Sequence, residues 1–343
     1  MKRLWHMIAL LSAGFACPVA GQPYQAAISP LEIADPTGQR DLKGFVWYPT
    51  DATGPLSIDF DSSVWVGTNV IREAAPADGP FPLLLLSHGM FGNARNQAWL
   101  AGAMARRGYV VAAIDHPGTS TWSRDPDARR RLWERPQDIT RLIDYATGSG
   151  AMAAPVDPDR IFMAGHSLGG FTAVALAGAR YDAAGLERFC DATQGDLVCR
   201  ILADWQIART PGDRLQMEAD LSDPRIRAFA VFDLGGTQSF SPDSLGRIDR
   251  PMLVFGAPIM NSGLTLDIES RALIQALEPE QTTYIEPEDL SHFDFLGECK
   301  PEGFEILAQE EPGDEVICEG GGAPRAAKHR AIVNEVANFF DRS

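Results

Sequence analysis

A serine flanked by glycines is the clearest chemical signal in this sequence. Ser167 stands in the stretch Gly165-His166-Ser167-Leu168-Gly169, after an apolar run and before a helix-like stretch of small residues. In a Gly-x-Ser-x-Gly turn between a strand and a helix, the serine takes a strained conformation that exposes its hydroxyl. The helix N-terminus beside it favours developing negative charge. The pattern therefore predicts that Ser167 is the nucleophile of an acyl-transfer reaction.

A serine hydroxyl is a weak nucleophile at neutral pH and needs a neighbouring base. The sequence has six histidines, and two of them, His292 and His329, lie late in the chain. His292 follows the strand-like run Thr282 to Ile285, whereas His329 lies in the final helix-like stretch. Because the base is expected on a loop after the last strands, we predict that His292 fills this role.

The acidic residue that would orient His292 has two candidates, Asp233 and Asp267. Asp233 follows the apolar run Ile226 to Phe232, at the carboxyl end of a strand, where site residues gather in parallel sheets. Asp267 is the first acidic residue after the next strand-like run, Met252 to Gly256, and this is the commoner location for such an acid. The residues favour Asp233 and leave Asp267 open.

The tetrahedral intermediate of acyl transfer needs hydrogen-bond donors for its oxygen. A His88-Gly89-Met90 turn directly follows the leucine run Leu83 to Leu86. Such a turn can aim the Met90 N–H at the nucleophile, and the Leu168 N–H, directly after Ser167, supplies a second donor. We therefore expect Met90 and Leu168 to form the oxyanion hole; the alternative is an ordinary glycine loop after a core strand.

Short apolar runs typical of strands alternate along the chain with longer runs typical of helices. The expected strands are Gly44 to Tyr48, Pro82 to Ser87, Tyr109 to Ile114, Ile161 to Ala164, Ile226 to Phe232, Met252 to Gly256 and Thr282 to Ile285. The expected helices are Gln97 to Arg107, Pro136 to Ala146, Leu168 to Ala177, Ser270 to Leu277 and Ala326 to Phe340. The alternation predicts an α/β fold with a mainly parallel central sheet and helices on both faces.

Two segments interrupt this alternation. Residues 51–80 are rich in Pro, Gly, Asp and Ala, and we expect them to form an irregular excursion between early strands. Residues 181–225 form a longer insertion, helical in part, soon after the helix that follows Ser167. This insertion is either a cap over the site or a surface elaboration with no part in substrate choice.

The N-terminal segment has the layout of a secretory signal peptide. Lys2 and Arg3 precede an apolar stretch, which is followed by small residues. The apolar stretch is shorter than the roughly 20 residues of a membrane span. We therefore expect residues 1–21 to be a signal peptide, residues 22–343 to be the mature domain, and the protein to be periplasmic or secreted. A lipid-anchored form, attached through Cys17, is the weaker alternative.

Charge and cysteine content narrow the remaining classes. The chain has 46 acidic and 30 basic residues and a net charge of -16, which argues against nucleic acid and anionic membranes as partners. Its 343 residues and 45% hydrophobic content suffice for a large buried core. In an exported protein, four cysteines beyond the signal segment favour disulfides, and we expect the local pairs Cys190–Cys199 and Cys299–Cys318. The cysteine spacing gives little support to a zinc site.

Three stretches resemble the serine hydrolases of the α/β-hydrolase superfamily, and more narrowly the platelet-activating-factor acetylhydrolase group and the bacterial predicted dienelactone hydrolases. They are Leu86 to Gly92, Gly108 to His116 and Gly165 to Gly170. The likeness extends over most of residues 25–343 and implies an α/β-hydrolase fold with a Ser-His-Asp triad. In the acetylhydrolase pattern the triad acid follows the strand after the nucleophile helix, which favours Asp233. True dienelactone hydrolases use a cysteine where this chain has Ser167, so that name says little about the substrate.

Together these features predict an exported serine hydrolase that cleaves carboxylic esters with small or short-chain acyl groups through an acyl-enzyme on Ser167. The expected substrate is a small-molecule or lipid ester, and the reaction needs no metal or organic cofactor. Two alternatives stay open. An acyltransferase would pass the same acyl group to an alcohol, and a noncatalytic binding protein would keep the scaffold without the chemistry.

Overall fold

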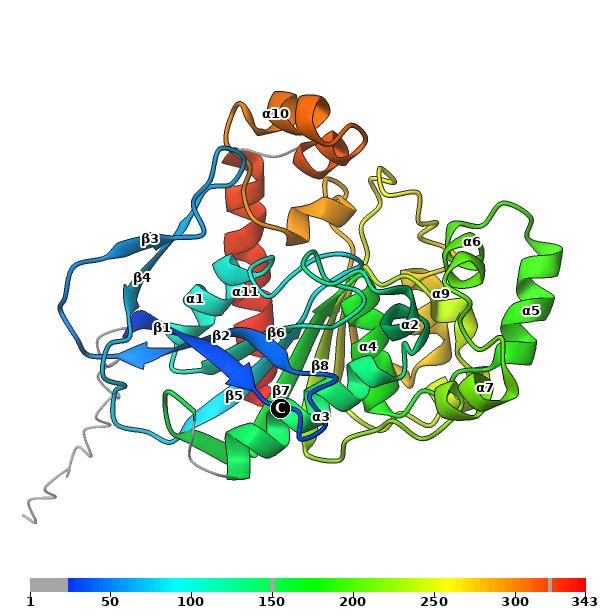
Figure 1. Cartoon of the computed structure of the whole chain (residues 1–343), viewed down its shortest axis with the longest axis horizontal. Helices are drawn as coiled ribbons and strands as arrows, with labels where there is room; N and C mark the ends of the chain where they lie inside the picture. Colours follow the sequence, from blue (N-terminus) through cyan, green and yellow to red (C-terminus); the bar gives the residue numbers. More distant parts are fainter. Residues whose placement is uncertain (1–23, 149–151, 320–322) are drawn as a thin grey trace, which may run out of the picture.

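The computed structural model describes residues 24–148, 152–319 and 323–343, which fold around one central sheet (Figure 1). The predicted signal peptide, residues 1–21, and Cys17 within it lie outside the described residues. None of the helices in the described ranges combines the length and the apolar composition of a membrane span.

The described residues form a ten-stranded sheet in the order β10-β9-β8-β7-β5-β6-β2-β1-β4-β3. The strands are β1 (Gln25–Ile33), β2 (Leu42–Thr50), β3 (Ser57–Asp59), β4 (Thr68–Arg72), β5 (Phe81–Ser87), β6 (Val110–Asp115), β7 (Val156–His166), β8 (Ile226–Phe232), β9 (Met252–Phe255) and β10 (Thr282–Ile285). Strands β6, β5, β7, β8, β9 and β10, in this order across the sheet, run parallel to their neighbours. Strand β2 is antiparallel to both β6 and β1. The mainly parallel sheet predicted from the sequence is confirmed.

The central strand β5 shows why a continuous apolar run lies in the middle of the sheet. Each of its residues is buried. Leu84 pairs with Val111 of β6 on one side and with Phe162 of β7 on the other. Helices cover both faces, which is why the middle of β5, Leu83 to Leu86, is entirely apolar. The turn that follows β5 is therefore held at the carboxyl edge of the sheet, next to the turn that follows β7.

Three strands at the edge of the sheet that ends in β3 differ from the sequence-based expectation. β3 and β4 are short and lie within residues 51–80, which we expected to be irregular. β1 pairs with β2 along its whole length, from Gln25 opposite Thr50 to Ile33 opposite Leu42. Pairing of this kind stabilises strands whose local sequence is weakly patterned, because the hydrogen bonds come from a distant partner.

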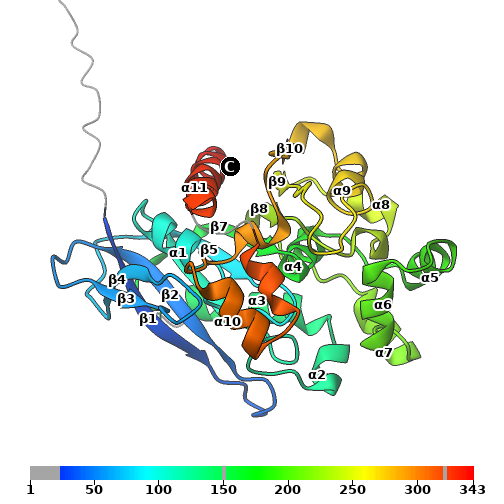
Figure 2. The same cartoon turned by 90° about the horizontal axis from the view of Figure 1, so that it is seen from above.

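Helices form a layer on each face of the sheet. Figure 2 shows α1 and α11 on one side and α3 and α4 on the other, and the two sides bury separate hydrophobic clusters. The α-helices are α1 (Ala98–Ala105), α2 (Pro126–Arg130), α3 (Glu134–Gly148), α4 (Leu168–Ala177), α5 (Ala183–Ala192), α6 (Leu197–Asp204), α7 (Pro211–Met217), α8 (Pro242–Leu245), α9 (Ser270–Ala276), α10 (Gly303–Glu310) and α11 (Ala323–Arg342). Short 3-10 helices are η1 (Thr237–Ser239), η2 (Pro279–Gln281), η3 (His292–Phe295) and η4 (Asp314–Cys318).

The insertion at residues 181–225 contains α5, α6 and α7, in agreement with the expected partial helicity. Each helix begins at a side chain that accepts a hydrogen bond from the first turn: Asp182 for α5, Asp196 for α6 and Thr210 for α7. Figures 1 and 2 both place these helices beside the end of the sheet that is remote from β3 and β4.

Both expected disulfides are present. Cys190 of α5 is bonded to Cys199 of α6. Cys299 is bonded to Cys318, which closes the loop that contains α10 and η4. Each disulfide therefore fastens a segment that lies outside the alternating strands and helices of the core.

Candidate active site

Ser167 occupies the sharp turn between β7 and α4. Its backbone has φ 55° and ψ -117°, a strained conformation for a residue other than glycine. The turn is also crowded, because a Cβ atom on Gly165 would lie 2.0 Å from the carbonyl oxygen of Gly169. A Cβ atom on Gly169 would lie 1.9 Å from the carbonyl oxygen of Ser87, at the end of β5. Only glycine fits at either position, which explains the Gly-x-Ser-x-Gly spacing.

His292 and Asp233 come from loops after different strands and meet at the same edge of the sheet. Asp233 directly follows β8, and His292 begins η3, beyond β10. The Nδ1 atom of His292 lies 2.7 Å from Oδ2 of Asp233, and both side chains are buried. The other oxygen, Oδ1, accepts hydrogen bonds from the Ala257 N–H at 3.0 Å and from the Ser270 hydroxyl at 3.4 Å. The carboxylate is thereby fixed in one orientation toward the imidazole.

The two rival residues lie elsewhere. Asp267 is exposed and forms an ion pair at 2.7 Å with Arg271, four residues further along the chain. His329 is buried on α11, where its ring stacks on Trp99 and its Nε2 atom bonds to the carbonyl oxygen of Asp294. Neither residue lines the pocket that holds Ser167.

The sequence analysis gave no role to His166, the residue before Ser167. Its Nε2 atom lies 2.9 Å from the carbonyl oxygen of His292, and the two rings are 4.5 Å apart. Burial, reinforced by the neighbouring His292, holds the pKa of His166 well below its usual range, so its ring is neutral. Since a carbonyl can only accept, the proton lies on Nε2 and is donated to the backbone of His292. His166 therefore anchors the segment that carries the imidazole.

Met90 and Leu168, whose N–H groups are the expected oxyanion donors, lie in the turn after β5 and at the start of α4. Met90, Leu168, Ser167 and His292 all line one pocket. A Cβ atom on Gly89 would lie 3.1 Å from Cβ of Ser167, so the turn after β5 directly adjoins the serine. Among the described residues, neither N–H has an acceptor, and no direct hydrogen bond joins the Ser167 hydroxyl to His292. The assignment of these two N–H groups to the oxyanion hole remains a prediction.

The pocket has a volume of about 380 Å³ and mostly apolar walls. One wall comes from α6 and the residue after it, through Val198, Ile201 and Trp205. The loop closed by the Cys299–Cys318 disulfide also lines the pocket, through Leu307 of α10 and Ile317 of η4. The segments fastened by the two disulfides therefore both contribute to the surface that a substrate would contact.

Glu269 is a second residue that the sequence analysis passed over. One of its oxygens accepts hydrogen bonds from the N–H groups of Gly236 and Thr237, both at 2.8 Å. These residues lie in the segment that begins with Asp233, so the hydrogen bonds to Glu269 fix the position of that segment. Burial raises the pKa of Glu269 to about 7, although the two hydrogen bonds oppose the rise. In the sequence, Glu269 is recognisable only as an acidic residue just before α9. Acidic residues are common at the N-termini of helices, so this position does not indicate a special role.

Within the described ranges, no group of three or more His, Cys, Asp or Glu side chains could hold a metal ion. The hydroxyl of Ser167, the imidazole of His292 and the carboxylate of Asp233 are the groups that serve as nucleophile, base and orienting acid in a serine triad.

Residues 83–321 match the Alpha/beta hydrolase family. The chain belongs to this family. The match includes every residue assigned above to the candidate site, from the turn after β5 to His292. The superfamily expected from the sequence is therefore confirmed, together with its fold.

Characterised relatives of this α/β hydrolase are distant and cover part of it. It is 27% identical to a bis(hydroxyethyl) terephthalate hydrolase of Streptomyces coelicolor over 159 aligned residues. The aligned part covers 44% of this chain and 46% of the relative. It is 28% identical to cutinase 2 of Thermobifida cellulosilytica over 145 aligned residues, and this aligned part covers 39% of this chain and 52% of the relative. The chain thus matches about half the length of these relatives.

Among solved structures, this α/β hydrolase resembles a ferulic acid esterase from Streptomyces cinnamoneus. The two share 24% sequence identity with a TM-score of 0.61, and the superposition covers 95% of this chain and 92% of the esterase. At this identity the likeness establishes the fold alone.

Proposed function

We propose that this protein is an exported serine esterase that hydrolyses carboxylic esters through Ser167, His292 and Asp233. The observation that carries the proposal is the 2.7 Å contact between His292 Nδ1 and Asp233 Oδ2, with the imidazole facing the pocket of Ser167. The names of the relatives, which are hydrolases, cutinases and an esterase, support the same reaction class.

The reaction begins when His292 Nε2 takes the proton of Ser167 as the serine oxygen attacks the ester carbonyl carbon. Asp233 accepts the Nδ1–H of His292, which leaves Nε2 unprotonated and stabilises the imidazolium once it forms. The carbonyl oxygen, now an oxyanion, binds the N–H groups of Met90 and Leu168. Collapse of this intermediate expels the alcohol, which receives the proton from His292.

Deacylation repeats these steps with water. His292 removes a proton from a water molecule, whose oxygen attacks the carbonyl carbon of the ester on Ser167. The same two N–H groups bind the second oxyanion, and its collapse releases the carboxylic acid and returns the proton to Ser167. Besides the ester and water, each step uses the side chains of Ser167, His292 and Asp233 and the two backbone N–H groups.

We propose that the preferred esters have small acyl groups, including compact aromatic ones. A pocket of about 380 Å³ with mostly apolar walls accommodates a short or cyclic acyl group. Its aromatic lining includes Phe171, Trp205 and Phe293, which suits a flat ring. Two similar proteins, the bis(hydroxyethyl) terephthalate hydrolase and the ferulic acid esterase, carry the names of aromatic acids.

We further propose that residues 22–343 form one hydrolase domain in which the insertion at 181–225 is a cap. Support comes from α6 of this insertion, whose apolar face contributes Val198 and Ile201 to the pocket. The two disulfides support export, because such bonds persist in oxidising compartments.

The test is hydrolysis of p-nitrophenyl acetate, butyrate, octanoate and benzoate by residues 22–343 and by its Ser167→Ala variant. We expect kcat/KM to be highest for acetate, butyrate and benzoate and to fall by about tenfold or more for octanoate. The variant should lose several orders of magnitude in rate while keeping the wild-type circular dichroism spectrum. A folded wild-type protein that hydrolyses none of the four esters would contradict the proposal.

A further inference from the structure

A buried arginine lies directly behind the turn that carries Met90. Arg135 comes from the first turn of α3 and is 1% exposed. Its Nε atom donates to Thr172 Oγ1 at 3.0 Å, and Nη1 donates to Thr119 Oγ1 at 2.7 Å. Its Nη2 atom donates to the His88 carbonyl at 2.5 Å and to Ser87 Oγ at 3.1 Å. All of these acceptors are neutral oxygens.

These contacts join the two segments that carry the oxyanion donors. The His88 carbonyl belongs to the turn after β5, two residues before the N–H of Met90. Thr172 lies on α4, and its hydroxyl donates to the Leu168 carbonyl at 3.0 Å, at the start of the nucleophile helix. One rigid guanidinium therefore sets the separation between the turn and the helix, because its donors lie in a fixed plane.

The His88 ring fixes the peptide group that contains the Met90 N–H. His88 Nε2 accepts a hydrogen bond from the His116 N–H at 3.0 Å, so the ring proton lies on Nδ1. Nδ1 then donates to the Gly89 carbonyl at 2.7 Å, which is the oxygen of the Gly89–Met90 peptide. Burial holds the pKa of His88 well below its usual range and so keeps this ring neutral. Because the Gly89 carbonyl and the Met90 N–H belong to one planar peptide group, the hydrogen bond to that carbonyl also fixes the direction of the N–H.

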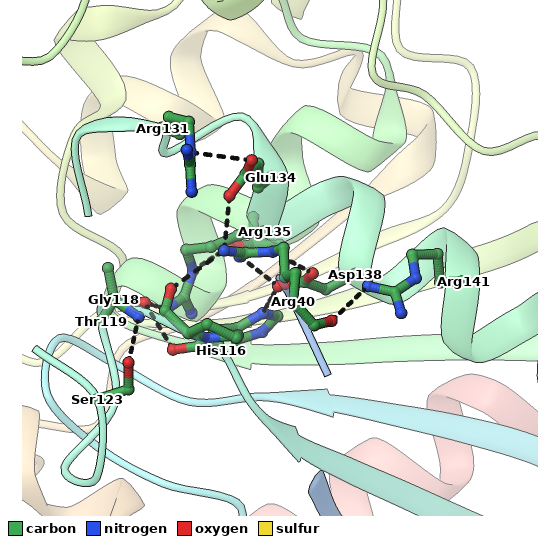
Figure 3. Close-up of polar contacts among 12 residues, drawn as sticks. Arg40, His116, Gly118, Thr119, Ser123, Arg131, Glu134, Arg135, Asp138 and Arg141 are labelled. Atoms are coloured by element: carbon green, nitrogen blue, oxygen red, sulfur yellow. Dashed lines mark hydrogen bonds and ion pairs between the residues drawn. The ribbon is translucent and has the colours of Figure 1, made fainter. Parts of the chain in front are cut away.

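The neighbouring charges leave the Arg135 cation without a directly bonded counterion. Asp138 is bound by Arg40 through two contacts of 2.7 Å and by His116 Nδ1 at 2.9 Å (Figure 3). Glu134 contacts Arg40 and Arg131 instead. Within the described residues no carboxylate lies in ion-pair contact with Arg135. Burial lowers the pKa of Arg135 to about 9, and the group therefore remains a cation at neutral pH.

We propose that Arg135 is a positioning residue for the oxyanion hole. Through His88 and Thr172 it holds the Met90 and Leu168 N–H groups at the separation that the tetrahedral intermediate needs. Its positive charge, buried behind the turn, adds to the stabilisation of the oxyanion in a medium of low dielectric. The inference rests on the proposed esterase function, since it assigns Arg135 a part in that reaction.

A thionoester comparison separates positioning from simple structural support. In p-nitrophenyl thionoacetate the carbonyl oxygen is replaced by sulfur, a larger atom and a weaker hydrogen-bond acceptor. Hydrolysis of the oxygen ester depends strongly on well-placed N–H donors, whereas hydrolysis of the thionoester depends on them much less. The ratio of the two kcat/KM values therefore reports on the oxyanion hole, and it does not change when only the folded fraction of the enzyme falls.

We expect Arg135→Lys, which keeps the charge and loses the planar fork, to lower kcat on the oxygen ester by about 10- to 100-fold, somewhat less than loss of a whole oxyanion donor. KM should stay within about threefold, and the oxygen-to-sulfur ratio should fall by about tenfold or more. Thr172→Val, which removes the link to α4 with little change in volume, should lower the same ratio by a smaller factor.

The matched control is Arg250→Lys. Arg250 is half-buried and donates to the Asp223 and Ile226 carbonyls at the opposite end of β8. This variant should leave the ratio unchanged. An unchanged ratio in both Arg135→Lys and Thr172→Val, in an active enzyme, would overturn the inference and leave the esterase function intact. A wild-type protein that hydrolyses neither ester would overturn the esterase function and the inference together.

Discussion

The Nδ1 atom of His292 lies 2.7 Å from Oδ2 of Asp233, although 59 residues separate them in the chain. The contact depends on β8, β9 and β10 running parallel, because their carboxyl ends then open onto the same edge of the sheet. The N–H of Ala257, after β9, holds the second oxygen of Asp233 at 3.0 Å. The pair is therefore preorganised before any substrate arrives.

Asp233→Asn should reduce kcat for p-nitrophenyl acetate by about 10³- to 10⁴-fold, because an amide at this position no longer holds the imidazole in the useful tautomer. Asp267→Asn is the matched control. Asp267 is exposed and paired with Arg271, so its replacement should change kcat by less than about twofold. The opposite pattern, with a large loss only in Asp267→Asn, would refute the assignment of the acid.

Gly169→Ala should destabilise the protein by about 3 kcal/mol or more, because its Cβ would lie 1.9 Å from the Ser87 carbonyl oxygen and would push the elbow away from β5. Urea unfolding followed by tryptophan fluorescence measures the change. Gly212→Ala in α7 is the control, since its Cβ would meet nothing nearer than 4.0 Å. The control should change the free energy of unfolding by less than about 1 kcal/mol. Equal effects of the two substitutions would show that the elbow tolerates a side chain.

Glu269→Gln should flatten the pH dependence of stability. Burial raises the pKa of Glu269 from 4.5 to about 7, so between these values the native protein binds a proton that the unfolded chain releases. This group therefore lowers the free energy of unfolding as the pH rises through that window, by on the order of 3 kcal/mol. The glutamine variant lacks this contribution.

Urea unfolding of both proteins at pH 5.0 and pH 7.5 tests this expectation. The variant should gain stability relative to the wild type at the higher pH. The exposed Glu280→Gln variant serves as the control and should keep the wild-type slope. Parallel slopes for the wild type and Glu269→Gln would contradict the account of this buried carboxyl.

Features encoded by local sequence could be predicted, and features set by distant contacts could not. The elbow at Ser167 follows from glycines two residues away on each side, so its motif is complete in the sequence. The choice between Asp233 and Asp267 depends on which loop faces His292, and the residues alone could only favour one. Arg135 falls on a polar-looking stretch of α3, where a charged residue usually indicates a solvent-facing position. Its burial arises from the packing of α3 against the turn after β5.

The edge strands illustrate the same limit. β1 was missed because its sequence is weakly patterned, and its full pairing with β2 supplies the hydrogen bonds that stabilise it. By contrast, β8 was predicted at its observed bounds, Ile226–Phe232, because a buried parallel strand has a largely apolar sequence, here interrupted only by the exposed Arg227 near its start.

The most direct test of the proposed mechanism is to identify the residue that diethyl p-nitrophenyl phosphate modifies. This reagent transfers its diethylphosphoryl group to an activated serine and releases p-nitrophenol, and tandem mass spectrometry locates the adduct. We predict one adduct, on Ser167, with loss of esterase activity in proportion to labelling and much slower labelling in Asp233→Asn. Loss of activity with Ser167 unmodified, or an adduct on another residue, would contradict the account.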